Sequence, residues 1–167
     1  EPDIGLHNVW WDDFQHLGDY ARRLCWLLSD GKLICDVAIL TDGNDAASAA
    51  ARLLMESQID FVYIDDVALD DSTVNGHLLQ VGEQGFRTII CDPPRKEMHP
   101  QLVALGDAGG HVIPSWTRES LIDDVRSQRE PDLLWPNAPE LRVIHYVKDD
   151  RDLYFLNNEG EERIEGE

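Results

Sequence analysis

The side chains best placed for chemistry lie in the turns that follow the apolar segments of the chain. In a parallel α/β sheet, ligands bind beyond the carboxyl ends of the strands, so each turn can be tested against a known kind of site. The four turns are Thr41 to Asp45, Asp65-Asp66, Asp92-Pro93 and Ser115-Trp116-Thr117.

The acidic residues of these turns argue against two kinds of phosphate chemistry. A phosphate-binding loop needs several glycines and usually a lysine, whereas the first turn holds one glycine between Asp42 and Asp45. We interpret these two aspartates as turn and helix-capping residues. Asp65, Asp66 and Asp92 supply the carboxylates of a magnesium-dependent phosphoacceptor site, but the lysine that such a site needs at a later strand end is missing.

Cys91 and Ser115 are the candidate nucleophiles, and we expect neither to be catalytic. A nucleophile elbow needs small residues around the nucleophile, so that a tight strand-to-helix turn exposes its side chain. An aspartate and two prolines follow Cys91, and Trp116 follows Ser115, which opposes such a turn. Nothing in the sequence pairs His99 or His111 with a nucleophile, so covalent catalysis is a minor alternative.

The cysteines and histidines favour no metal site and no cofactor. The three cysteines include no CxxC pair, and their odd number indicates a reducing compartment rather than a disulfide framework. We therefore expect a cytoplasmic protein in which Cys25 and Cys35 are small core residues. The six histidines lack the spacing of metal ligands. They are His7, His16, His77, His99, His111 and His145.

The charge balance disfavours some partners. The 167 residues include 14 basic and 33 acidic side chains, which gives a net charge of −19. Such a surface repels the phosphate backbone of nucleic acids, and no apolar run is long enough to span a membrane. A neutral ligand such as a sugar is compatible with this charge, although most of the acidic residues are expected to serve solubility.

Strand and helix patterns alternate, which predicts an α/β fold with a parallel sheet and helices on both faces. The first helix has apolar residues at the helical period from Phe14 to Leu28, with Asp12 or Asp13 as its cap and Gly31 at its end. Further helices are expected at residues 46–56 (capped by Asn44 or Asp45), at 100–106, and after a Thr117 cap. The expected strands are 33–40, 59–64, 74–81 with a hairpin or an edge excursion at Asn75-Gly76, 87–91 and 111–114.

The C-terminal part predicts a β-hairpin. Residues 141–147 and 152–158 flank a short polar turn, with Leu153 and Phe155 on one face and Tyr154 and Leu156 on the other. We therefore divide the chain into a linker and helix at 1–32, an α/β domain at 33–135 and a hairpin element at 136–167.

Aromatic residues crowd the first helix and the segment before it. We assign Tyr20 and Trp26 to an ordinary core. Trp10 and Trp11 precede the helix, and adjacent residues of an extended segment point to opposite sides. Both cannot enter one small core, so Trp10, Trp11 and Phe14 form the candidate interface with a neighbouring domain or subunit.

Several segments resemble a known family. Asn8–Phe14, a Tyr-x-x-Arg pattern at Tyr20, a Leu-Leu-x-x-Gly end at Leu27 and an Asp-Val-Ala strand at Asp36 are similar to the region after the catalytic barrel of large bacterial glycoside hydrolases. There the strand opens a domain resembling class I glutamine amidotransferases, akin to the β-galactosidase trimerisation domain. Further segments resemble its later strands and the β-sandwich that follows it. They are Ile59–Asp65, Phe86–Ile90, Leu105–Ile113 and Asp152–Asn158.

The resemblance implies a flavodoxin-like or amidotransferase-like sheet in a non-catalytic structural or assembly domain of a glycoside hydrolase in carbohydrate metabolism. It implies the catalytic barrel of the parent chain as a partner, where paired carboxylates break the glycosidic bond, and allows a homo-oligomer. Two alternatives stay open. One is a stand-alone hydrolase or amidotransferase-like enzyme that uses Cys91 or Ser115, and the other is a carbohydrate-binding module that uses Trp10 and Trp11.

Overall fold

The computed structural model describes residues 8–42, 48–129 and 131–165, and it has a mixed α/β fold with one parallel and two antiparallel sheets. The chain separates into two compact units: residues 1–34 with 146–153, and residues 35–145 with 154–167. Within the described residues, no helix has the length and apolar character needed to cross a bilayer.

The first unit contains the predicted first helix. A short 3-10 helix, η1 (Trp11–Asp13), leads into α1 (Phe14–Leu28). Asp13, one of the two predicted caps, occupies the N-cap position of α1, but its side chain makes no capping hydrogen bond. The left-handed residue after the helix is Asp30, with φ of 59°, and not Gly31.

Gly31 serves a different purpose from the predicted helix end. A Cβ atom at this position would lie 3.0 Å from Cδ1 of Tyr146. The absence of a side chain therefore lets the chain pass close to strand β9 (Leu141–Lys148) before it enters β1 (Lys32–Leu33). β1 pairs antiparallel with β9, with Leu33 opposite Tyr146.

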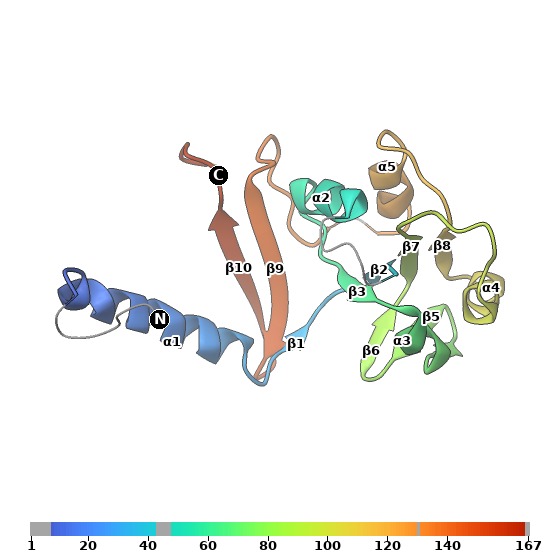
Figure 1. The fold of residues 1–167 in the computed structure, drawn as a ribbon, viewed down its shortest axis with the longest axis horizontal. Helices are drawn as coiled ribbons and strands as arrows, with labels where there is room; N and C mark the ends of the chain where they lie inside the picture. Colours follow the sequence, from blue (N-terminus) through green and yellow to red (C-terminus); the bar gives the residue numbers. More distant parts are fainter. Residues whose placement is uncertain (1–7, 43–47, 130, 166–167) are drawn as a thin grey trace. The chain divides into compact units, whose positions relative to one another are not determined.

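The second unit contains the four-stranded parallel sheet, with the strands in the order β3-β2-β7-β8 (Figure 1). The strands are β2 (Val37–Leu40), β3 (Val62–Ile64), β7 (Thr88–Cys91) and β8 (His111–Ile113). The predicted single strand at 33–40 is wrong, because β1 and β2 belong to different sheets. Asp36 lies between them, and its carbonyl accepts hydrogen bonds from the backbone N–H groups of Arg87 and Thr88.

Both faces of the parallel sheet are covered, as predicted. Val37 and Ile39 point to the face covered by α2 (Ala49–Glu56) and α5 (Leu121–Arg126). Ala38 and Leu40 point to the other face, where they pack with residues of α3 (Asp66–Asp70) and α4 (Pro100–Asp107). This alternation along β2 buries four consecutive residues, which explains the continuous apolar run in the sequence.

The antiparallel elements agree with the predicted turns. β4 (Thr73–Asn75) and β5 (Leu78–Val81) form the hairpin predicted at Asn75-Gly76, and β6 (Gln84–Phe86) adds a third strand that was not predicted. β9 and β10 (Arg151–Asn158) form the C-terminal hairpin. Asp149 and Asp150 connect them with φ of 51° and 58°, the pattern of a type I′ turn.

Several predicted helix boundaries change. Asn44 and Asp45 lie outside the described residues, and the observed cap of α2 is Ser48, whose Oγ accepts a hydrogen bond from Ala51 N–H at 3.0 Å. Ser120 rather than Thr117 directly precedes α5. Thr117 and Ser120 instead exchange hydrogen bonds of 3.3 Å between side chain and backbone, which closes the turn before the helix.

The predicted burial of three residues on α1 is wrong. Tyr20 and Trp26 have 46% and 59% of their surface exposed, and Cys25 is also exposed. Trp26 is held from outside the helix, because Nζ of Lys148 lies 4.6 Å from its ring centroid. The same ammonium donates a hydrogen bond to the carbonyl of Ser29 at 2.6 Å. This cation–π contact gives the exposed indole of Trp26 a fixed partner, although the residue does not pack in a core.

Candidate functional site

The carboxyl edge of the parallel sheet is the candidate site, and its first element is the start of α2. Asp92 follows β7, and its carboxylate accepts a short hydrogen bond from Oγ of Ser48 and a longer one of 3.4 Å from Ala50 N–H. The N-terminus of a helix attracts negative charge because its first N–H groups lack partners within the helix. Asp92 therefore occupies the position at this helix that an anionic ligand would need.

At the next part of the edge, Arg95 and Asp66 form an ion pair. Arg95 binds both carboxylate oxygens of Asp66, at 2.5 and 2.9 Å, and this hydrogen bonding lowers the pKa of Asp66. Asp65 caps α3 by accepting a hydrogen bond from Ala68 N–H at 2.8 Å. The three carboxylates considered for a magnesium site, those of Asp65, Asp66 and Asp92, thus each serve a separate local contact.

His99 is similarly occupied. Its Nδ1 accepts a hydrogen bond from Gln101 N–H at 3.3 Å and so caps α4. Its Nε2 lies 3.0 Å from Oδ1 of Asp70. With Nδ1 as an acceptor, Nε2 carries the proton and donates to Asp70. This histidine therefore positions α4 against α3 and has no nitrogen left to act as a base.

Cys91 lies inside the sheet rather than on an exposed turn. It is the last residue of β7 and is 0% exposed, and burial raises the pKa of its thiol. Its carbonyl accepts a hydrogen bond of 3.1 Å from Nε1 of Trp116, and the following Asp92-Pro93 peptide bond is cis. A buried thiol with a raised pKa is a poor nucleophile, because the thiolate is the reactive form.

His111 cannot assist Cys91, because it lies at the opposite end of its strand. β7 and β8 are parallel, and His111 pairs with Thr88 at the start of β7. Cys91 lies three positions after Thr88, which corresponds to about 10 Å along a strand. Burial lowers the pKa of His111, which favours its neutral form. Among the described residues, no histidine side chain forms a hydrogen bond with Cys91.

Ser115 is exposed on the loop after β8, and Trp116 beside it packs against the core between the sheet, α2 and α5. Three hollows with volumes of about 390, 330 and 420 Å³ lie elsewhere, around residues 135–138 and on the outer side of α2. Neither Cys91 nor Ser115 lines any of these three. Within the described parts of the chain, no group of three metal-ligating side chains is close enough to hold a metal ion.

A second polar cluster, which the sequence did not reveal, lies at the opposite edge of the sheet. The carboxylate of Asp60 accepts a hydrogen bond from His145 N–H at 3.1 Å, and Nδ1 of His145 lies 2.8 Å from Oδ2 of Asp132. Arg129 binds Oδ1 of Asp132 at 2.5 Å and approaches Asp36 at 3.4 Å. These residues are spread over more than 100 positions of the chain, so no local sequence motif predicts the cluster.

Burial affects the two carboxylates of this cluster differently. It raises the pKa of Asp60 to about 6, despite the opposing hydrogen bond from the backbone of His145. Asp132 is also partly buried, but its hydrogen bonds with Arg129 and His145 outweigh burial and lower its pKa. Asp132 is therefore the well-paired acid, and Asp60 is the acid whose charge is poorly compensated.

Gln58 is a further anchor that sequence reasoning missed. Its side chain is almost completely buried, and Nε2 donates to the carbonyls of Trp135 and Ala138 at 2.9 and 3.1 Å. Oε1 accepts a hydrogen bond from Trp135 N–H at 2.6 Å. The residue itself has a left-handed backbone, with φ of 59°. One glutamine thus ties the segment before β9 to the end of α2.

The candidate interface residues form an aromatic group at the start of α1. The rings of Trp11 and Phe14 are stacked with centroids 5.3 Å apart, and Trp10 lies 5.9 Å from Phe14 in a tilted arrangement. Trp10 is 39% exposed. The 3-10 helix brings the side chains of Trp10 and Trp11 to the ring of Phe14. The two tryptophans therefore do not point to opposite sides, as they would in an extended segment.

The contacts of Asp92 with the start of α2 lead to a first prediction. We expect Asp92→Ala to lower the free energy of unfolding by about 1–2 kcal/mol, because it removes the carboxylate that accepts from the cap residue Ser48 and from Ala50 N–H. Asp92→Asn keeps an acceptor oxygen and should cost less. Urea denaturation of both variants checks this order, and an Asp92→Ala variant as stable as the wild type would show that these contacts do not stabilise α2.

Comparison with known proteins adds no relative: no family model, no curated protein and no solved structure matches this chain.

Proposed function

We propose that this chain is a non-catalytic structural or assembly domain of a glycoside hydrolase, with an amidotransferase-like α/β body. The sugar connection comes from the sequence resemblance at Asn8–Phe14, Tyr20–Arg23 and Asp36–Ala38. The order of the parallel strands, counted along the chain, is 2-1-3-4, which is compatible with the flavodoxin-like arrangement that the resemblance implies.

The observation that carries the proposal is that the described polar side chains at the carboxyl edge of the sheet bind one another. In a sheet of this order, the position between the first and third strands is where ligands usually bind. Here β2 and β7 are those strands, and Asp92 and Ser48 bind each other and the α2 N-terminus beside them. Arg95 and Asp66 form a bidentate pair at the same edge. These polar groups are used to hold the fold, which suits an architectural role.

The buried position of Cys91 argues against the amidotransferase-like alternative. Class I amidotransferase chemistry needs a thiolate that reaches its substrate. Cys91 is inaccessible, and its carbonyl is held by Trp116. The exposed Ser115 has no hydrogen-bonded base among the described residues, so it has no means of activation.

Three measurements on the 167-residue chain test this function. We expect no turnover of nitrophenyl glycosides and no ammonia release from glutamine above the buffer rate. We also expect a maleimide to label Cys25 at least about 100-fold faster than Cys91, because thiol reactivity follows exposure and thiolate character. Glycoside turnover at enzyme-like rates, or preferential labelling of Cys91, would overturn the proposal.

The connection to a glycoside hydrolase has its own test. The reading frame that encodes this chain is expected to encode a catalytic barrel with two strand-end carboxylates before residue 1. A frame that encodes a different kind of enzyme there would remove the sugar connection and leave only the architectural role.

A further inference from the structure

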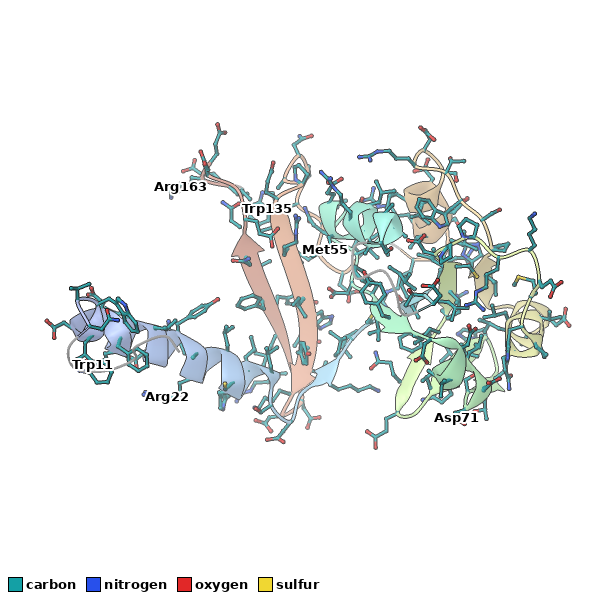
Figure 2. The ribbon with its side chains drawn as sticks, viewed as in Figure 1. Trp11, Arg22, Met55, Asp71, Trp135 and Arg163 are labelled. Carbon is teal, nitrogen blue, oxygen red and sulfur yellow. The ribbon has the colours of Figure 1, made fainter. Side chains whose placement is uncertain are left out.

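The buried face of β9 changes from apolar to polar along the strand. Leu141 and Val143 pack in a small core with Ala138, and Trp135, labelled near the start of β9 in Figure 2, packs against this core. The next residue on the same face is His145, which is 8% exposed. A titratable side chain therefore takes the position of a third apolar residue on the buried face of β9.

Two carboxylates from distant segments bind this histidine. Asp60, which precedes β3, accepts a hydrogen bond from the backbone N–H of His145 at 3.1 Å, and Oδ2 of Asp132 lies 2.8 Å from its Nδ1. The ring of Tyr154 on β10 stacks on the imidazole, with the centroids 4.3 Å apart. At this residue β9 is thus attached to the rest of its unit through groups whose charge depends on pH.

The described groups around His145 contain more acid than base. Arg129 binds Asp132 and approaches Asp36, so one guanidinium serves two carboxylates before Asp60 is considered. The buried thiol of Cys35 is close enough to be affected by Asp60 and Asp36, and it stays neutral because burial raises its pKa to about 12. We call the charged groups the Asp60 cluster, and they are Asp36, Asp60, Arg129, Asp132 and His145.

Asp60 is the carboxyl of this cluster whose charge is least compensated. It accepts from a backbone N–H, whereas Asp132 binds a guanidinium. Burial raises the pKa of Asp60 to about 6, against the opposing hydrogen bond and imidazole of His145, and the charge of Asp132 adds to the increase. A protonated carboxyl still has an oxygen that accepts from His145 N–H, so protonation removes the charge without removing this contact.

We propose that the Asp60 cluster is a pH-sensitive attachment, which holds residues 141–145 of β9 in place when Asp60 is protonated and loosens when Asp60 and Asp132 are both charged. The loosening is a local opening of this part of β9 that leaves the parallel sheet folded. The inference goes beyond the proposed function and does not depend on it.

Hydrogen exchange of the 167-residue chain tests this inference. The attached state binds the proton of Asp60 more tightly than the open state, so attachment weakens as the pH rises. After correction for the intrinsic pH dependence of exchange, the protection of residues 141–145 should fall about tenfold from pH 5 to pH 8. This is the factor that a pKa of about 6, against an ordinary value of 3.8, gives over that range. A protection that does not change with pH would overturn the proposal.

A comparison with β2 shows whether the opening is local. At pH 8 the amides of residues 141–145 should exchange at least about tenfold faster than those of β2, and low urea should accelerate exchange in β2 alone, because only global unfolding exposes much new surface. Equal protection of the two strands at pH 8 would show that Asp60 acts on the stability of the whole fold, and it would refute local release.

Two neutralising variants separate the Asp60 carboxyl from a general effect of charge. Asp60→Asn keeps an acceptor for His145 N–H but does not titrate, so the protection of residues 141–145 at pH 5 and pH 8 should agree within about twofold. Asp107→Asn removes the same charge from the exposed end of α4 and should keep the wild-type pH dependence. An Asp60→Asn variant that retains the wild-type pH dependence would contradict the proposal.

Discussion

Replacement of Gln58 by alanine is expected to lower the free energy of unfolding by about 2–4 kcal/mol, because the buried side chain loses three hydrogen bonds to partly or fully buried backbone groups together. The carbonyls of Trp135 and Ala138 lose their donor, and Trp135 N–H loses its acceptor. Urea denaturation monitored by far-UV circular dichroism measures the loss. If the free energy of unfolding of Gln58→Ala lies within 0.5 kcal/mol of the wild-type value, about the error of such a measurement, Gln58 does not anchor the segment before β9.

Three further variants isolate the cause of this loss. Gln58→Gly removes the same hydrogen bonds but suits the left-handed backbone, so it should be more stable than Gln58→Ala by about 1 kcal/mol. Gln58→Glu keeps an acceptor for Trp135 N–H but lacks the two donated bonds, and it should be at least as damaging as alanine. Gln15→Ala, on the exposed surface of α1, should change stability by less than about 0.5 kcal/mol.

In contrast to Gln58→Ala, the Asp60→Asn variant should have a higher free energy of unfolding than the wild type at pH 8. Burial raises the pKa of Asp60 to about 6 in the folded state, against an ordinary value of 3.8. The folded state therefore binds the proton more tightly than the unfolded chain, and the stability that this provides is lost as the pH rises from about 4 through 6. The difference corresponds to about 3 kcal/mol as an upper value at pH 8. Asparagine still accepts from His145 N–H without carrying the charge.

The pH dependence distinguishes this explanation from a general packing effect. The advantage of Asp60→Asn should shrink as the pH falls from 8 to 4, because the wild-type carboxyl is then protonated as well. Asp132→Asn serves as the matched control with the reverse behaviour. Its lowered pKa means that ionised Asp132 stabilises the fold, so this variant should be destabilised at pH 8 and recover toward the wild type at low pH. Equal effects of Asp60→Asn at pH 4 and pH 8 would contradict the assignment.

The parallel sheet and its helices were predictable because their signals are local. β7 and α4 follow from a buried apolar run and from a proline in the first helical turn. The C-terminal hairpin follows from alternating residues around a polar turn. The short helix α3 was missed, because five residues are too few to show a helical period, and Asp65, which caps it, was considered only as a metal-binding carboxylate.

The remaining features depend on contacts between distant residues. Gln58 and Trp135 are 77 positions apart, and a polar residue after a helix gives no hint of such a partner. The period of the apolar residues predicted α1 itself but not the exposure of these residues, because an amphipathic pattern does not say what covers the helix. For the candidate site, the composition of the turns argued against an elbow at Cys91, but the pairing of Asp92 with Ser48 required the register of β2 and β7.

The carboxylate at the start of α2 also bears on how such a scaffold could change. A carboxylate of the chain itself already lies beside the first N–H groups of this helix. An anionic ligand would have to displace Asp92 to bind there. A protein designer who wanted such a ligand would therefore first replace this aspartate by a neutral residue.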